Sequence, residues 1–356
     1  MLIKRYVNRE ILTPLLSICA ILVVIFSGYS AARYLPDAAN GLMTGKTVLA
    51  LVSLRILIAL EVLIPITLFL SVITVLARLH ASSEIIAMRA CGLGERSLFS
   101  SVFQVSLVVA LIVAALSLYV RPWAYEKSYW LKADAEANFD LSRLRPGRFH
   151  EIGESQYVVF IETLDAHQSR AKGVFIEQRR ETSRKVTRAN EAWQEVDPLT
   201  SEKSIVLRDG YHYEFTDKDA NTKLIRFQNT RLALIPKQVE SSAYRRKAAS
   251  TISLSKSTDP GDIAEFQWRI STGFSTVLLG LLGVPLGRTA PRRGKSVHVF
   301  QGVIIFAIYY NMTAVAKIWM EQGVVGSFPG VWWPQFLLVF LFIFLLQPFR
   351  SGTSYK

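Results

Sequence analysis

Residues that could carry out catalysis or bind a metal are few in this sequence and lie far apart. The two cysteines, Cys19 and Cys91, form no metal-binding motif and are too few for a disulfide scaffold. No Gly-x-Ser-x-Gly nucleophile motif is present. The five histidines show no metal-binding spacing; they are His80, His150, His167, His212 and His298. The sequence therefore favours transport, anchoring or scaffolding over an enzyme, and it predicts no catalytic residue, metal site or cofactor in this chain.

One short segment, Gly294-Lys295-Ser296, resembles the end of a phosphate-binding loop. Such a loop needs another glycine five positions before Gly294, and Thr289 stands there. The loop also follows a β-strand, whereas this segment lies in a basic stretch between two apolar blocks. We therefore expect no nucleotide site here.

The elements that must position any functional residue are long apolar blocks. Hydrophobic residues make up 51% of the 356 residues and charged residues 19%, which is near the average, but the apolar residues are concentrated. The blocks have 17 to 24 residues each, which is within the range of helices that cross a hydrocarbon core of about 30 Å. The six blocks are Ile11–Ala32, Ile56–Leu79, Ser97–Val120, Ile270–Leu286, Val297–Trp319 and Trp332–Phe349. We predict an α-helical polytopic membrane protein with six transmembrane helices.

A polar stretch separates the third block from the fourth. It contains alternating and β-branched runs, among them Gln156–Thr163, Gly173–Gln178 and Lys223–Leu234. Asp209-Gly210 between two further runs predicts a hairpin turn. We expect an all-β, jelly-roll-like domain, so that the chain divides into a first membrane half at 1–121, the β-domain at 122–268 and a second membrane half at 269–356.

The net charge of +13 is mostly a topology signal. The stretch 122–268 has a net charge of only +1, so that the membrane parts carry +12. Basic residues gather on one side of the six spans, and the opposite short connections carry only Arg33 and Lys46. By the positive-inside rule we expect both termini in the cytoplasm and the β-domain outside it, with no role for nucleic acid. The basic residues on the cytoplasmic side are Lys4, Arg5, Arg9, Arg78, Arg89, Arg96, Arg288, Arg292, Arg293, Lys295, Arg350 and Lys356.

The loop after the second span predicts a short helix at about 82–92. Ser82 or Ser83 can cap it, Glu84 lies in its first turn, and Gly92 can end it. It is either an interfacial helix with its apolar residues among the lipid headgroups or a docking helix for a cytoplasmic partner. The residues alone leave both open and favour the first.

A few charged residues near the spans have two interpretations each. Arg33, at the outer end of the first span, is either an ordinary interface residue or a ligand for the phosphate of an anionic lipid. Lys317 and Glu321 are four residues apart and either neutralise each other, which we prefer, or face a substrate cavity. Glu61 has no assigned role, because Arg55 is not on its helical face.

Small residues also mark the fourth span. Gly283 and Gly287 form a Gly-x-x-x-Gly pair, which permits close helix packing within the chain or against a partner. Glycine is also simply common in membrane helices, so the preference for tight packing is slight.

Several segments resemble the lipopolysaccharide-export permeases LptF and LptG, the membrane subunits of an ABC-type exporter. The resemblance covers nearly the whole chain and is strongest at Ser83–Gly92. Cys91, in Ala-Cys-Gly, is more like the F subunit. The other matching segments are Arg5-Tyr6, Arg9-Glu10, Leu63–Leu70, Trp268-Arg269-Ile270, Pro285-Leu286 and Pro291–Lys295.

The resemblance implies a transporter subunit of a Gram-negative inner membrane, without its own ATPase. Its partners would be a homologous LptG-like permease, a cytoplasmic LptB-like ATPase dimer that binds ATP and magnesium, and a single-span LptC-like protein with a jelly roll. Lipopolysaccharide would be extracted from the outer leaflet and passed to a periplasmic bridge. Arg33 and, second to it, Lys317 would contact lipopolysaccharide. The ATPase-coupling residues would be Ser83, Glu84, Ile85, Ile86, Met88 and Arg89.

Three alternatives remain at this point. The first is the permease of another ABC-type lipid or lipoprotein release system, although such permeases usually have four spans. The second is a membrane-anchored receptor, which would need a larger cytoplasmic domain than the loop at 78–96. The third is a membrane-embedded enzyme, which lacks recognisable catalytic groups.

Overall fold

The computed structural model describes most of the chain in two compact units. The helical unit comprises Met1–Gly28, Leu54–Glu126 and Ser241–Lys356, and the sheet unit comprises Tyr29–Ser53 and Lys127–Glu240. The described residues are 2–41, 43–92, 94–137, 144–152, 157–165, 170–180, 183–196, 203–216, 219–233, 246–288 and 295–350.

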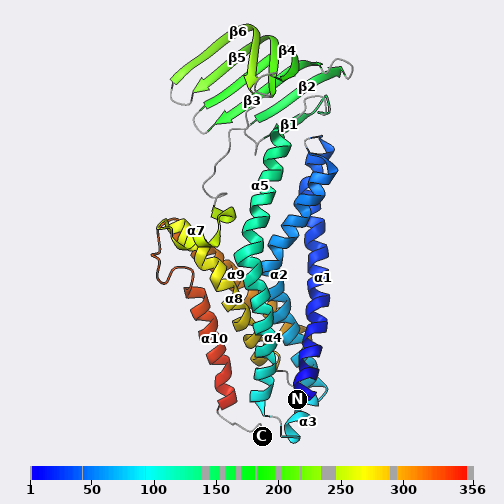
Figure 1. Ribbon diagram of the computed structural model, residues 1–356, viewed down its shortest axis with the longest axis vertical. Helices are drawn as coiled ribbons and strands as arrows, with labels where there is room; N and C mark the ends of the chain where they lie inside the picture. The colour runs from blue at the N-terminus through cyan, green and yellow to red at the C-terminus, as the bar shows by residue number, and fades with distance from the viewer. Residues whose placement is uncertain are drawn as a thin grey trace. The chain divides into compact units, whose positions relative to one another are not determined.

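Long helices dominate the structure (Figure 1). In the described residues, five helices are long and apolar enough to cross a membrane by length and composition, and Trp333–Leu346 is a shorter apolar helix. The six apolar blocks are thus confirmed as helical. The helices are α1 Leu2–Ala39, α2 Gly45–Ala81, α3 Glu84–Ala90, α4 Glu95–Ala115, α5 Arg121–Ala137, α7 Thr251–Ser255, α8 Pro260–Leu286, α9 Lys295–Glu321 and α10 Trp333–Arg350, with a π-helical turn η1 at Leu116–Val120.

Small residues let α8 pack closely against its neighbours. A Cβ atom added at Gly283 would lie 2.8 Å from Val72 Cγ1, and one added at Gly287 would lie 2.8 Å from Leu76 Cβ. These distances are too short for a side chain, so both glycines are needed for the contact with α2. The close packing expected of the Gly-x-x-x-Gly pair therefore occurs within the chain.

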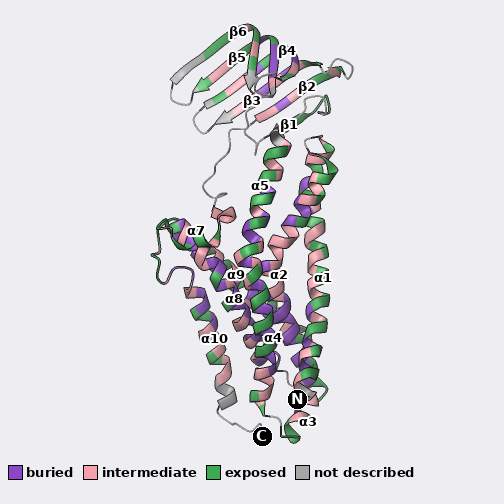
Figure 2. Ribbon diagram, in the orientation of Figure 1, coloured by how far each residue is buried: buried purple, intermediate pink, exposed green. Residues whose placement is uncertain are grey.

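The helices differ in how much apolar surface they bury within the chain. In α2, 56% of the most apolar window is buried, whereas in α1 the share is 11%. The helix α8 is also largely buried, and Figure 2 shows it with much purple, while α1 is mainly pink and green. An apolar helix that its own chain leaves uncovered faces lipid or another protein.

A π-helical turn joins α4 to α5. The turn is followed by Arg121 and Pro122, and proline has no amide hydrogen to donate to the carbonyl four residues earlier. That carbonyl belongs to Leu118. A π-helical turn next to a proline is a usual way for a long helix to continue past such a break.

The sheet unit contains one antiparallel six-stranded sheet inserted between the helices, as predicted, but it also includes the helical ends of α1, α2 and α5 and is therefore not all-β. The described strands pair in chain order, β1 to β6, as a meander. The sequence missed β4 because its residues are mostly polar or small. The strands are β1 Phe149–Ile152, β2 Tyr157–Asp165, β3 Arg170–Arg180, β4 Ser183–Val196, β5 Lys203–Thr216 and β6 Asp219–Ala233.

The predicted hairpin at Asp209-Gly210 is wrong. Asp209 has a φ of 50°, but it lies inside the single strand β5. The register with β4 runs from Arg208↔Glu191 to Gly210↔Ala189 and passes over Asp209. A residue with positive φ can interrupt a strand without reversing the chain.

Five strands share this interruption in one row across the sheet. In each pair of neighbouring strands from β2 to β6, the register leaves out one residue of each strand at the same level. Among these residues, Gly173 in β3 has a positive φ of 63°, as Asp209 has one of 50°. We call it the inserted row; it consists of Glu162, Gly173, Asn190, Asp209 and Gln228.

The inserted row keeps the apolar side chains on one face. In a regular strand the inward residues alternate with period two. Across the row the spacing between buried residues is three, as between Ala171 and Val174 in β3 and between Ala189 and Ala192 in β4. Each of these five strands thus gains one residue at the same level, and neither the register across the row nor the buried face changes. The core behind this face includes Val159, Ile161, Ala171, Val174, Ile176, Ala189, Ala192, Ile205 and Leu207.

Candidate functional site

The short helix α3 lies between α2 and α4 at the end of the helical unit (Figure 1). Ser83 occupies the N-cap position, as predicted, but it has a φ of 60° and its side chain makes no capping hydrogen bond. Cys91 is the C-cap, and Gly92 follows with a φ of 81°. The predicted end of the helix is therefore confirmed, since glycine readily adopts this conformation.

Both carboxylate oxygens of Glu84 accept hydrogen bonds within the chain. Ser82 Oγ donates to Oε1 over 2.8 Å, and Tyr6 Oη donates to Oε2 over 2.9 Å. Both donors are hydroxyl groups, and together they fix the direction of the carboxylate. Tyr6 comes from the start of α1, which links that helix to α3.

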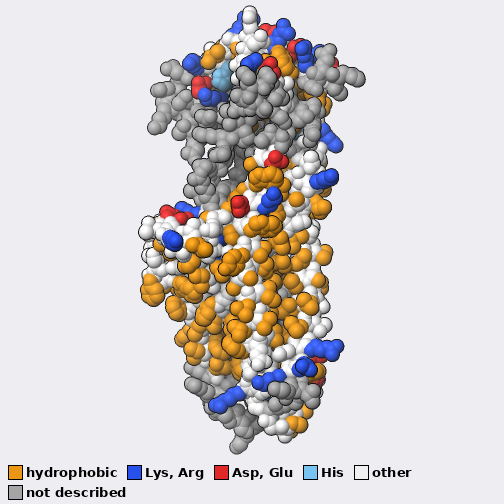
Figure 3. Space-filling model, in the orientation of Figure 1, with side chains coloured by type: hydrophobic (Ala, Val, Ile, Leu, Met, Phe, Trp, Pro, Cys, Tyr) orange, Lys and Arg blue, Asp and Glu red, His pale blue; other side chains and the backbone are white. Residues whose placement is uncertain are grey.

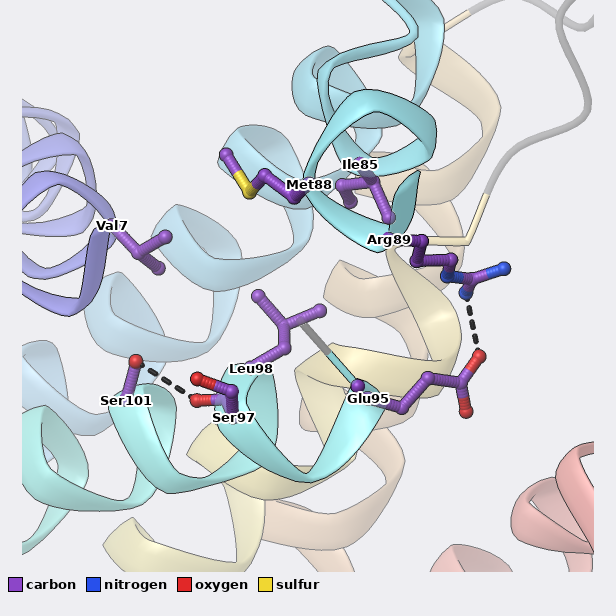
Figure 4. A pocket seen from close by; sticks show the side chains of 9 residues that line it. Val7, Ile85, Met88, Arg89, Glu95, Ser97, Leu98 and Ser101 are labelled. Atoms are coloured by element: carbon purple, nitrogen blue, oxygen red, sulfur yellow. Dashed lines mark hydrogen bonds and ion pairs between the residues drawn. The ribbon is translucent and has the colours of Figure 1, made fainter. Parts of the chain in front are cut away.

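The apolar residues of α3 divide between the protein interior and the surface. Ile85 is 5% exposed and belongs to a core with residues of α1, α2 and α4, whereas Ile86 is 62% exposed. Arg89 extends beside a small cavity of about 30 Å³ and pairs with Glu95 at 2.5 Å (Figure 4). Met88, half-buried, lines the same cavity. One face of α3 thus anchors it, and the other is open.

The two expected lipid-binding residues lie in different surroundings. Arg33 is exposed on α1, which continues for six residues beyond it to Ala39. Lys317 is mostly buried; its Nζ lies 3.8 Å from Glu321 Oε1, as the four-residue spacing predicted, and it also forms an ion pair with Glu265.

Lys317 belongs to a larger group of buried charges, which we call the ionic cluster. Its side chains range from 0% to 13% exposed and come from α2, α5, α8 and α9. Three are basic and two are acidic, and Glu321 supplies a third carboxylate beside Lys317. The members are Glu61, Arg121, Glu265, Arg269 and Lys317.

Two arginines join the carboxylates of the ionic cluster. Arg121 Nε lies 3.1 Å from Glu61 Oε2, and Arg121 Nη2 lies 3.2 Å from Glu265 Oε1. Arg269 Nε donates to the same Glu265 oxygen over 3.2 Å. Arg121 is therefore the buried cation for Glu61, which the sequence left without a role.

Neutral groups complete the environment of Glu61. Its Oε1 accepts from Ser117 Oγ at 2.8 Å, from Trp268 Nε1 at 3.0 Å and from Thr272 Oγ1 at 3.3 Å. Removing a charge from water costs several kcal/mol unless ion pairs and hydrogen bonds replace the hydration, and this set of partners does so.

Sequence reasoning missed most of the ionic cluster. One signal was present, because Glu265 and Arg269 are four residues apart just before an apolar block and form an i, i+4 pair. Nothing local marked Arg121 as the partner of Glu61, which lies 60 residues earlier. In the part of the chain that the structure describes, no group of three or more His, Cys, Asp and Glu side chains could hold a metal ion.

Comparison with known proteins identifies the family. The family model of the lipopolysaccharide export system permease LptF/LptG matches residues 5–348. The lipopolysaccharide export system permease protein LptF of Escherichia coli strain K12 is 26% identical over 346 residues, which cover 96% of this chain and 93% of that protein. The LptF proteins of Escherichia coli O157:H7 and Shigella flexneri match equally. The expected likeness to the F subunit agrees with these names, and the chain belongs to the lipopolysaccharide export system permease LptF/LptG family.

Proposed function

We propose that the chain is the transmembrane permease subunit of an ABC-type exporter for lipopolysaccharide. It extracts lipopolysaccharide from the outer leaflet of the inner membrane and passes it to a periplasmic bridge that leads to the outer membrane. A separate subunit binds ATP and magnesium and drives the process. Membership of the permease family over residues 5–348 is the observation that carries this proposal.

The distribution of charge supports an orientation with both termini in the cytoplasm and the sheet unit in the periplasm. Figure 3 shows hydrophobic side chains over the helices, with Lys and Arg gathered at the end where α3 lies. Arg78 and Arg89 belong to this end, and basic residues remain on the cytoplasmic side during membrane insertion.

The structure of α3 supports a coupling role in contact with an ATPase dimer. Glu84 presents a positioned negative charge, and Ile86 presents an exposed apolar side chain next to it. A basic residue and an apolar groove on the ATPase would complement this pair. Ser83, Ile85, Met88 and Arg89 would complete the contact or hold α3 in position.

The exposed apolar surface of α1 supports assembly with a homologous LptG-like permease, and a single-span LptC-like protein would be a further partner. Lipopolysaccharide would enter between the two permeases. Arg33, exposed on α1, would bind a phosphate of lipid A, and Lys317 would contribute as a second basic group near the path.

The test replaces Glu84 with alanine. We expect Glu84→Ala to reduce lipopolysaccharide export and co-purification of the ATPase in mild detergent, while membrane insertion stays normal. Glu10→Ala is the matched control, because it removes a carboxylate that pairs with Arg78 and does not belong to α3. Normal export together with normal ATPase co-purification in Glu84→Ala would refute the coupling role. Mass spectrometry of the lipid bound to the purified complex tests the substrate.

A further inference from the structure

The break between α4 and α5 leaves one backbone carbonyl without its helical donor. In an α-helix the carbonyl of Leu118 would accept from the amide of residue 122, but residue 122 is proline and has no amide hydrogen. A side chain from a distant segment supplies the donor. Thr251 Oγ1, at the start of α7, donates to Leu118 O over 2.7 Å.

Arg269 fixes the same threonine from the other side. Its Nη1 donates to Thr251 Oγ1 over 2.9 Å, so the hydroxyl accepts from Arg269 while it donates to Leu118. A hydroxyl has one hydrogen and accepts through its lone pairs, which makes this pair of bonds compatible.

All five N–H groups of Arg269 have acceptors. Nε donates to Glu265, and Nη1 donates to Thr251 Oγ1 and to the carbonyl of Ala249 at 2.9 Å. Nη2 donates to the carbonyls of Arg246 and Lys247, each at 3.2 Å. The side chain is 0% exposed. Only the planar fork of a guanidinium can serve five acceptors in this arrangement; an ammonium has three hydrogens.

These bonds lie close to the points where the chain passes between the helical unit and the sheet unit. The chain crosses between the two units four times, and the two crossings that flank the strands follow Glu126 and precede Ser241. The outgoing connection passes through Leu118 and Pro122, and the returning one passes through Arg246–Thr251. These two of the four connections to the sheet unit are therefore fastened to Arg269 of α8, inside the helical unit.

The ionic cluster connects these hydrogen bonds to the packing of α5 against α8. Glu265 Oε1 accepts from Arg269 and also lies 3.2 Å from Arg121, the first residue of α5. A displacement of α8 that keeps these bonds must carry both connections with it.

We propose that Arg269 is a positioning residue for export, which holds the two connections that flank the strands on α8 through Thr251 and the carbonyls of 246–249. Movement of the helices that accompanies ATP hydrolysis then reaches the sheet unit through two attachments at once. This inference rests on the proposed function for its role in export. The fastening itself can be measured independently of that function.

The experiment compares variants that separate charge from hydrogen-bond geometry. Arg269→Lys keeps the positive charge beside Glu265 but loses the fork. Thr251→Val removes the hydroxyl while leaving every charge of the ionic cluster in place, and Thr251→Ser retains the hydroxyl. Thr313→Val is the matched control, because this buried threonine donates to Tyr309 O within its own helix.

Two measurements on the complete complex follow. Amide hydrogen exchange at 246–256 should become about tenfold faster in Arg269→Lys and Thr251→Val, since a hydrogen-bond network of this kind increases the protection of nearby amides by at least that factor. Lipopolysaccharide crosslinking to a photoreactive residue in place of Leu164 on the sheet should fall, while ATP hydrolysis continues. Thr251→Ser and Thr313→Val should behave as the unaltered complex does.

The outcomes separate the role of Arg269 in fastening the connections from the proposed function in export. Unchanged exchange and crosslinking in Arg269→Lys would reduce Arg269 to a counter-charge for Glu265 and overturn the proposal. Unchanged behaviour of Thr251→Val would overturn the link through Leu118. If the unaltered complex gives no lipopolysaccharide crosslink on the sheet, the proposed function fails, and the exchange data still decide whether the connections are fastened.

Discussion

Tyr6 and Glu84 lie 78 residues apart in sequence, and the tyrosine hydroxyl donates to Glu84 Oε2 over 2.9 Å. The bond joins the first turns of α1 to the surface helix α3. It fixes the direction of the one carboxylate that we propose for contact with the ATPase. Because Ser82 binds the other oxygen, the carboxylate has little freedom to turn away.

Tyr6→Phe should therefore weaken the association of the ATPase without removing the charge. A hydrogen bond of this kind contributes about 0.5–1.5 kcal/mol, which corresponds to a roughly threefold to tenfold change in affinity. The measurement is ATPase binding to the purified permease complex. Tyr119→Phe, at an exposed tyrosine away from α3, is the control. Equal affinities of Tyr6→Phe and the unaltered chain would show that Glu84 needs no positioning.

Arg121 should be more important for stability than Glu61, although the two form one ion pair. Arg121→Met leaves two buried carboxylates without this cation and should cost about 3–5 kcal/mol. Glu61→Gln still offers a carbonyl oxygen to Ser117 and Trp268 and should cost about 1–2 kcal/mol. Thermal unfolding in detergent compares them, and equal losses would contradict the shared role of Arg121.

Gly283 should not tolerate even one added methyl group. In Gly283→Ala the new Cβ would lie 2.8 Å from Val72 Cγ1 and 3.4 Å from the carbonyl of Phe69, so α2 and α8 must separate, at about 1–3 kcal/mol. Gly28→Ala is the control, since nothing lies within 4 Å of its added Cβ. The melting temperature should fall for Gly283→Ala alone. A similar effect at both sites would point to helix flexibility and not to packing.

Arg33→Glu should reduce lipopolysaccharide crosslinking at the outer end of α1. Reversing the charge removes the hydrogen bonds that an arginine makes to a phosphate and adds repulsion, so a loss of about tenfold or more is expected. Lys46→Glu changes the other basic residue of the same connection and serves as the comparison. Unchanged crosslinking in Arg33→Glu would leave Arg33 as an ordinary interface residue.

His212 should make the stability of the sheet depend on pH. Burial, and secondarily Lys185, lower the pKa of His212 from its ordinary value of 6.5, while Glu214 raises it. The unfolded chain then binds more protons than the folded one as pH falls below 6.5, so the contribution of neutral His212 is present above that pH and is lost below it. Protection of β4 and β5 amides, corrected for intrinsic exchange, should fall between pH 7.5 and pH 5.5. His212→Gln should remove this dependence, and an equal fall in His212→Gln would assign it to other groups.

The sequence predicted the membrane helices and the short helix α3 because their signals are local. A hydrocarbon core requires a continuous apolar run, and α3 ends at Ala90, shortly before Gly92, where the backbone has a positive φ. The strands were harder to predict. The two short runs Ser204–Arg208 and Tyr211–Thr216 belong to one strand of 14 residues, since Asp209 looked like a turn and is an insertion within the strand.

The ionic cluster could not be predicted from local patterns. Glu61 and Trp268 are 207 residues apart and meet only because α2 and α8 pack together. The bond from Thr251 to Leu118 depends on a carbonyl that Pro122 leaves free, and a sequence pattern does not show which side chain will reach it. Arg33 and α3 carry charges whose proposed partners belong to other molecules, so the fold of this chain alone does not test them.

The inserted row also has a consequence for how the sheet assembles. Strands of 14 or 15 residues could pair in shifted alignments, since each shift by two residues keeps the same faces buried. A shift moves the interruption of one strand away from that of its neighbour, so that the two buried faces no longer match across the row. The row thus fixes the alignment of each new hairpin, and β4 to β6 have one correct pairing despite their length.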